Sequence, residues 1–246
     1  MKPVSPELEP PKPESLRLTA LSSEQITGQS QSHLQEVFPG HFLHRDVVAA
    51  YLGLVGQAAE HGITLRLASG FRSFERQLAI WNAKARGERG VVGSGGELVA
   101  MAELSERDKV FAILRWTALP GASRHHWGSD MDIWDSAAVA GDYQLQLTLE
   151  EYAEGGPFAA CSHWLDTLIS RGKTEFFRPY TGSGEGASGE GVAAEPWHLS
   201  FRPLATMCEQ ALSLDVISRV IENADICLKK TILENLDEIY SRFIGS

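Results

Sequence analysis

Two short segments of the chain concentrate histidine and carboxylate side chains, and the fold must bring the segments together if they act as one site. Residues 123–132 read Ser-Arg-His-His-Trp-Gly-Ser-Asp-Met-Asp. Residues 195–198 read Glu-Pro-Trp-His and add a third imidazole and another carboxylate. Two imidazoles and one carboxylate can hold a zinc ion tetrahedrally and leave one position open, as in catalytic zinc sites. The leftover Glu195 would then be the general base that takes a proton from the attacking water.

The spacing of these residues resembles a known family. Ser-x-His-x-x-Gly-x-x-x-Asp followed by Glu-x-x-His is similar to the D-alanyl-D-alanine metallopeptidases, which include VanY-type carboxypeptidases and VanX-type dipeptidases of the lysostaphin/hedgehog-like fold. Residues 69–77 resemble the family's Ser-Gly-Tyr-Arg-Ser-x-x-x-Gln segment, with Phe71 in place of the tyrosine. The resemblance spans roughly residues 60–202.

The resemblance implies a role for each matching residue. It makes His125, Asp132 and His198 the ligands of one zinc ion, which is the expected cofactor, and Glu195 the catalytic base. Arg72 becomes a catalytic and substrate-binding cation, because a guanidinium can bind a carboxylate or stabilise the oxyanion of a tetrahedral intermediate. Further substrate contacts are expected from Gln77, Ser123, His126, Trp127 and Trp197.

One position departs from the family pattern. Asp130 stands where the family commonly has a small apolar residue, and it would share a strand face with Asp132. An extra acid beside zinc could change the ligation or the substrate preference, so the role of Asp130 stays open at this point. For Ser123 and Gln77 a simple capping role is a nearly equal interpretation, and for Arg72 the alternative is a solvated turn residue.

Hydrophobic patterning predicts an α+β protein. A small, mostly antiparallel sheet would carry the zinc residues, flanked by N-terminal and C-terminal helices. Arg72 would sit at a strand-to-helix turn. The apolar positions of residues 203–243 predict two or three further helices. The other expected helices cover residues 45–61, 75–86 and 105–116, and the expected strands cover residues 63–69, 131–134 and 197–201.

Length and composition favour one elaborated catalytic domain. The chain of 246 residues can bury a full core, and a hydrophobic content of 43% with 22% charged residues is typical of globular proteins. We expect a flexible proline-rich arm over residues 1–20, a zinc carboxypeptidase domain over residues 21–202, and a helical extension packed on it over residues 203–246. The glycine-rich residues 181–194 are expected to form a flexible loop that flanks the site.

Charge and hydropathy limit the partners. A formal net charge of −10 argues against nucleic-acid binding, which needs concentrated Lys and Arg. No stretch reaches the ~18 apolar residues of a membrane span, and the start of the chain is proline-rich and charged, so we expect a cytoplasmic protein. The three cysteines, Cys161, Cys208 and Cys227, are expected to be reduced. The sequence does not indicate the oligomeric state.

The resemblance covers several peptide specificities. VanY-type enzymes that cut D-Ala-D-Ala on wall precursors usually work outside the cytoplasm, so a cytoplasmic member would meet recycled muropeptides. We therefore expect a bacterial carboxypeptidase that removes the C-terminal D-alanine from peptidoglycan stem peptides, as an L,D-carboxypeptidase on tetrapeptides. The alternatives are a D,D-carboxypeptidase or D,D-dipeptidase, a non-catalytic zinc-containing binding module, and a peptidoglycan endopeptidase.

Overall fold

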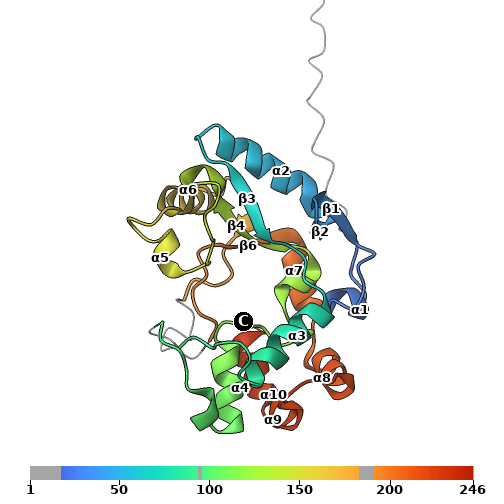
Figure 1. Cartoon of the computed structure of the whole chain (residues 1–246). Helices are drawn as coiled ribbons and strands as arrows, with labels where there is room; N and C mark the ends of the chain where they lie inside the picture. The colour runs from blue at the N-terminus through green and yellow to red at the C-terminus, as the bar shows by residue number, and fades with distance from the viewer. Residues whose placement is uncertain (1–17, 94–95, 183–190, 246) are drawn as a thin grey trace, which may run out of the picture.

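A computed structural model describes residues 18–93, 96–182 and 191–245 of the protein. Within these ranges the chain forms ten α-helices and two small antiparallel sheets, with helices from both ends of the chain around the larger sheet (Figure 1). The predicted α+β class is confirmed. Most of the arm predicted over residues 1–20, and most of the loop predicted over residues 181–194, lie outside the described residues.

The larger sheet has four strands in the order β3-β4-β6-β5, and each strand is antiparallel to its neighbour. The strands are β3 (Leu65–Ser69), β4 (Asp130–Asp135), β5 (Phe176–Phe177) and β6 (His198–Phe201). In this register Asp132 of β4 is the partner of His198 on one side and of Ser69 on the other. The sheet therefore joins the three sequence segments that carry the predicted site.

A β-hairpin that the sequence analysis did not predict supports one of these segments. It consists of β1 (Leu34–Phe38) and β2 (His41–His44) and leads directly into α2 (Arg45–Ala59). The backbone N–H of His44 donates to the carbonyl of Gly128 at 2.9 Å. Gly128 has a φ of +70°, and a Cβ atom there would lie 2.6 Å from the His44 nitrogen, so this close approach requires glycine. The hairpin thus holds the turn that presents His125.

The helices predicted before the site occur within two residues of the predicted bounds. Besides α2 they are α3 (Phe74–Ala85) and α4 (Glu106–Leu114). Ser73 begins α3, since its hydroxyl accepts from the N–H of Arg76, and Ser105 begins α4 in the same way. Three further helices are α1 (Ser23–Ile26), α5 (Leu149–Tyr152) and α6 (Ala159–Ser170).

Residues 202–243 form four helices, so the prediction of two or three was wrong. They are α7 (Arg202–Ala211), α8 (Leu214–Asn223), α9 (Lys229–Glu234) and α10 (Leu236–Phe243). Apolar residues continue across the breaks, which hides the breaks in the pattern. Ser213 caps α8 immediately after α7, and Leu228, with a φ of +64°, separates α8 from α9. In Figure 1 α8, α9 and α10 lie below the sheet, whereas α7 lies beside it.

A single large hydrophobic core joins the sheet to helices from both ends of the chain. Its fully buried members include Met131 and Ile133 from β4, Trp81 from α3 and Ile217 from α8. A smaller cluster of Tyr152, Phe158 and Trp197 packs beside the site. The three cysteines are unpaired. In the described part of the chain, no helix has both the length and the apolar character needed to cross a membrane.

Candidate active site

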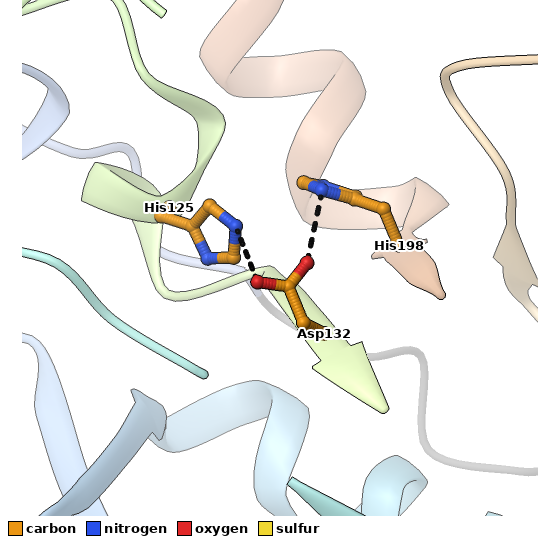
Figure 2. Close-up of side chains that lie close together, drawn as sticks. All are labelled: His125, Asp132 and His198. Carbon is orange, nitrogen blue, oxygen red and sulfur yellow. Dashed lines mark ion pairs between the residues drawn. The ribbon is translucent and has the colours of Figure 1, made fainter. Parts of the chain in front are cut away.

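Three residues from the two motifs converge beside the sheet. His125 belongs to the short turn Arg124–Trp127, Asp132 to β4 and His198 to the start of β6 (Figure 2). Asp132 Oδ2 lies 3.5 Å from His125 Nε2, and Asp132 Oδ1 lies 3.4 Å from His198 Nδ1. One ligand atom from each residue falls within 4.8 Å of the others, and all three residues are buried. The arrangement could hold one metal ion.

The hydrogen bonds around this group fit a zinc ion. His125 Nδ1 lies 2.7 Å from the carbonyl of Gly70, and His198 Nε2 lies 2.9 Å from Asp130 Oδ1, so each ring can donate its proton outward and keep the opposite nitrogen for a metal. Asp132 Oδ1 and His198 Nδ1 are buried polar atoms without a hydrogen-bond partner. Such atoms are costly to bury unless something binds them. Imidazole and carboxylate are ligands that zinc accepts.

The charges of these residues stabilise one another. Burial raises the pKa of Asp132, but the nearby charges of His125 and His198 bring it well below its ordinary value. Burial lowers the pKa of His198, but the hydrogen bond to Asp130 and the nearby carboxylates of Asp132 and Glu195 raise it well above its ordinary value. Since metal ligation requires a neutral ring, a zinc ion would take the place of the proton on His198.

Asp130 supports His198 and is not among the three candidate ligands. It is fully buried and accepts hydrogen bonds from Arg124 Nε at 2.8 Å and from the hydroxyls of Ser129 and Ser200. Burial raises the pKa of Asp130, but the charge of Arg124 and the hydrogen bond from His198 hold it well below its ordinary value. The departure from the family pattern at this position therefore supplies a carboxylate that orients His198.

Glu195 lies at the edge of the triad of His125, Asp132 and His198, where the sequence predicts the catalytic base. Its Oε2 is 3.2 Å from His198 Nδ1, and its backbone N–H donates to the carbonyl of Tyr180 at 3.0 Å. The ring of Tyr180 packs against His198 with centroids 5.0 Å apart, and burial raises the pKa of Tyr180 to about 12. Tyr180 belongs to none of the motifs identified in the sequence.

Arg72 faces the same group from the turn between β3 and α3. Its Nη1 donates to Gln77 Oε1 at 3.0 Å, and its Nη2 lies 4.0 Å from Asp132 Oδ2. The backbone of Arg72 is also fixed, because its carbonyl lies 2.6 Å from His126 Nδ1 and its N–H donates to the carbonyl of His125. The predicted strand-to-helix position of Arg72 is confirmed, and the guanidinium is directed toward the triad.

A cavity of about 760 Å³ opens over these residues. The triad, Glu195, Arg72, Ser123 and Trp197 line it. The other expected substrate contacts lie behind its wall. Gln77 and His126 are fully buried, with Gln77 Nε2 donating to the carbonyl of Ala118 and His126 Nε2 accepting from the N–H of Gly121. Trp127 packs against the guanidinium of Arg124. The structure gives Gln77, His126 and Trp127 supporting positions.

Residues 40–204 match the family described as VanY, D-alanyl-D-alanine carboxypeptidase. The chain belongs to this family. The resemblance drawn from the motifs is confirmed, and the class of zinc-dependent peptidoglycan carboxypeptidases and dipeptidases is confirmed with it. Because the matched region ends at residue 204, it covers the triad, Glu195 and Arg72 but only the first residues of α7.

Solved structures show a similar fold, and two curated sequences are similar to parts of the chain. The fold is similar to the zinc complex of the vancomycin-resistance D,D-pentapeptidase VanY from a VanB-type resistance cassette, with a TM-score of 0.50 and 22% identity over 83% of this chain and 91% of that one. Two uncharacterized proteins of Haemophilus influenzae are also similar. One is 42% identical over 103 residues, 40% of this chain and 70% of the relative; the other is 31% identical over 126 residues, 51% of this chain and 92% of the relative.

Several residues that line the cavity of this VanY-family protein belong to none of the motifs identified in the sequence. They include Lys84, Arg89, Thr117, Tyr180, Phe243 and Ile244. Lys84 and Arg89 come from α3 and the loop that follows it, and Phe243 and Ile244 come from the end of α10 and the residue after it. The C-terminal extension was expected to pack on the catalytic domain, and its residues Phe243 and Ile244 also form part of the cavity wall.

Proposed function

We propose that the protein is a zinc carboxypeptidase that removes the C-terminal D-alanine from peptidoglycan stem peptides. The arrangement of His125, Asp132 and His198 carries the proposal, because Asp132 Oδ1 and His198 Nδ1 lack hydrogen-bond partners and Glu195 lies 3.2 Å from the second of these atoms. The names of two structural neighbours support it, since one is a D,D-pentapeptidase with Zn(II) and another is VanYB with D-alanine-D-alanine.

The residues divide the chemistry among them. Zinc, when bound, supplies a Lewis acid that polarises the scissile carbonyl and makes water more acidic. Glu195 takes a proton from the attacking water and later donates it to the departing amine of D-alanine. Arg72 donates hydrogen bonds to the oxyanion as negative charge develops on the carbonyl oxygen. Gln77 holds Arg72 in position through the bond of 3.0 Å to its Nη1.

Within this class we favour L,D-carboxypeptidase action on tetrapeptides. The cavity wall includes Glu150, which is neither a candidate metal ligand nor a catalytic residue. This carboxylate and the cavity volume of about 760 Å³ support a long side chain with an amino group, such as that of diaminopimelate, before the D-alanine. A D,D-carboxypeptidase or D,D-dipeptidase is the second candidate, which the neighbour named D,D-pentapeptidase favours. A role in cytoplasmic recycling stays a prediction from the sequence.

The proposed catalytic unit reaches beyond the domain expected from the sequence. Residues 21–202 contain the triad, Glu195 and Arg72, whereas Phe243 and Ile244 line the cavity from the C-terminal extension. We therefore propose that the extension over residues 203–246 contributes to substrate selection as well as to packing.

Incubation with defined substrates tests the proposed function. The zinc-loaded protein is mixed separately with disaccharide-linked tetrapeptide and pentapeptide, and the mass loss and released D-alanine are followed, with chelator-treated protein as the control. Release from tetrapeptide alone supports the L,D-carboxypeptidase. Release of D-alanine from pentapeptide alone supports the D,D-carboxypeptidase, and release of a D-alanine dipeptide supports the D,D-dipeptidase. No product from either substrate contradicts the proposal and favours the binding module.

A further inference from the structure

Two cations line the cavity wall beyond Arg72. Lys84 lies on α3 seven residues after Gln77, so the two side chains project from the same side of the helix about two turns apart. Lys84 Nζ donates to Thr117 Oγ1 at 2.5 Å, and both residues line the cavity together with Arg89. Among the described residues, neither Lys84 nor Arg89 forms an ion pair with a carboxylate. This part of the cavity wall therefore presents positive charge to a bound substrate.

Lys84 is half-buried and, unlike two largely buried arginines of the chain, has no carboxylate within ion-pair distance in the described residues, whereas Arg89 is exposed. Arg124 is paired with Asp130 and Glu209, and Arg178 is paired with Asp166. The chain carries a net charge of −10, so carboxylates are plentiful. Burial, together with the charges of Arg89 and Arg72, lowers the pKa of Lys84 to about 8. An anion bound at this wall would offset this lowering, because an opposite charge favours the protonated ammonium group.

The position of Lys84 relative to Arg72 suits the last two residues of a peptide, with the scissile carbonyl at one cation and the C-terminal carboxylate at the other. Arg72 donates a hydrogen bond to Gln77, and Gln77 donates one to the carbonyl of Ala118. Lys84 donates a hydrogen bond to the side chain of Thr117, the residue before Ala118. Consecutive Cα atoms are about 3.8 Å apart, and helical side chains point toward the helix N-terminus, which brings the Lys84 ammonium back toward Arg72. Lys84 and Arg72 are thus anchored through two consecutive residues, Thr117 and Ala118, of one cavity wall. A scissile carbonyl and a C-terminal carboxylate are also separated by one residue.

We propose that Lys84, with Arg89 and Thr117 beside it, binds the free C-terminal carboxylate of the peptide while Arg72 faces the scissile carbonyl. The proposal rests on the proposed function and resolves the two roles open to Arg72. Lys84 is then a specificity residue, because a chain that continues past the scissile residue has no free carboxylate there. The subsite makes the protein an exopeptidase and disfavours endopeptidase action on cross-linked peptides.

Steady-state kinetics of Lys84→Met test the subsite. We expect KM for the preferred peptide to rise about tenfold to a hundredfold, as for the loss of a hydrogen bond to a charged group, with little change in kcat. Lys84→Arg should restore most of the affinity, because it keeps the charge. Lys173→Met, which changes an exposed lysine outside the cavity, is the matched control and should leave both constants unchanged. The same peptide with a C-terminal amide should be a poor substrate for wild type and for Lys84→Met alike.

Binding to metal-free protein separates the subsite from the chemistry. Acetyl-D-alanyl-D-alanine, acetyl-lysyl-D-alanine and their C-terminal amides are titrated calorimetrically into wild type and Lys84→Met. Wild type should bind the acids more tightly than the amides, and the variant should lose that preference. If this result is obtained while wild type releases no D-alanine from any peptide, the subsite stands and the proposed function fails.

Other outcomes overturn the subsite. An unchanged KM in Lys84→Met, or an equal loss of affinity for acid and amide, would show that Lys84 does not read the terminal carboxylate. A loss confined to peptides with diaminopimelate, and absent with lysine at the same position, would assign the cations to a side-chain carboxylate instead. The thermal unfolding temperature of Lys84→Met is measured as a control. If it equals that of wild type, a binding defect arises from the subsite and not from unfolding.

Discussion

Asp130 Oδ1 lies 2.9 Å from His198 Nε2 and determines which nitrogen of that ring carries the proton. With the proton on Nε2, the Nδ1 atom is left for a metal ion beside Asp132 and Glu195. The charge of Arg124, 2.8 Å from the same carboxylate, keeps Asp130 ionised in a fully buried position. A residue outside the three ligands therefore prepares one of them for zinc.

Asp130→Asn should weaken zinc binding by about 10-fold to 100-fold, the usual effect of losing a carboxylate that orients a histidine ligand. Competition with a chromogenic chelator measures the affinity. Asp166→Asn is a suitable control, since it also removes a carboxylate paired with an arginine but at an exposed position. An unchanged zinc affinity in Asp130→Asn would remove Asp130 from the metal site.

Arg72→Met should lower kcat by about 10²-fold to 10³-fold, the effect of removing a donor to the oxyanion. Gln77→Met should have a smaller effect of the same kind, because Gln77 is fully buried and acts by holding Arg72. The double variant should be no slower than Arg72→Met alone, since the two residues act as a unit. Additive losses in kcat would instead mean that Gln77 acts independently of Arg72.

The motifs predicted the centre of the site but not its outer wall. The triad and Glu195 share spacings imposed by zinc chemistry, so they were visible before the fold was known. Lys84 and Phe243 have no such signal, because a lysine on an amphipathic helix and an aromatic residue near the end of α10 are ordinary in isolation. Only the packing of α3, α4 and α10 places them on one cavity. Tertiary contacts of this kind are not encoded in local spacing.

The fold was predicted to a similar extent. The sequence pattern predicted helices close to α3 and α4, whereas the β1–β2 hairpin was missed although Pro39 and Gly40 at its turn were a usable signal. The break between α8 and α9 was hidden because Leu228 adopts a positive φ that usually favours glycine. No propensity of leucine indicates that conformation.

Phe243→Ala should raise kcat/KM for disaccharide-linked peptide relative to free peptide, because the ring lines the cavity and its loss widens the entrance. Phe111→Ala provides the matched control. Phe111 contacts Phe243 with ring centroids 5.9 Å apart but does not line the cavity. A comparison of the two substrates cancels any general loss of stability. Equal effects of Phe243→Ala on both substrates would exclude a role of the C-terminal wall in selection.

The metal-free protein should lose stability as the pH falls from about 6.5 to about 4, in part because of His33. Burial, and the charge of neighbouring His44, lower the pKa of His33 from 6.5 to about 4, so the unfolded chain binds a proton in this window that the folded chain does not. At about 1.4 kcal/mol per unit, the difference amounts to roughly 3 kcal/mol in the free energy of unfolding.

Denaturant titrations of His33→Phe at several pH values measure this contribution. The variant should depend less on pH between about 6.5 and about 4 than wild type does, whereas His163→Gln, at an exposed position, should behave as wild type. The nearby charge of Arg45 also lowers the pKa of His33, and Arg45 is retained in the variant. An identical pH dependence in His33→Phe and wild type would contradict the assignment.

The most direct test of the zinc carboxypeptidase is to measure zinc content and D-alanine release together in wild type and Glu195→Gln. Glutamine keeps the size of Glu195 but cannot accept the proton of the attacking water. We expect both proteins to hold a single zinc ion, and we expect the variant to release D-alanine about 10²-fold to 10⁴-fold more slowly. Release by Glu195→Gln at the wild-type rate, or full activity of wild type without zinc, would contradict the account.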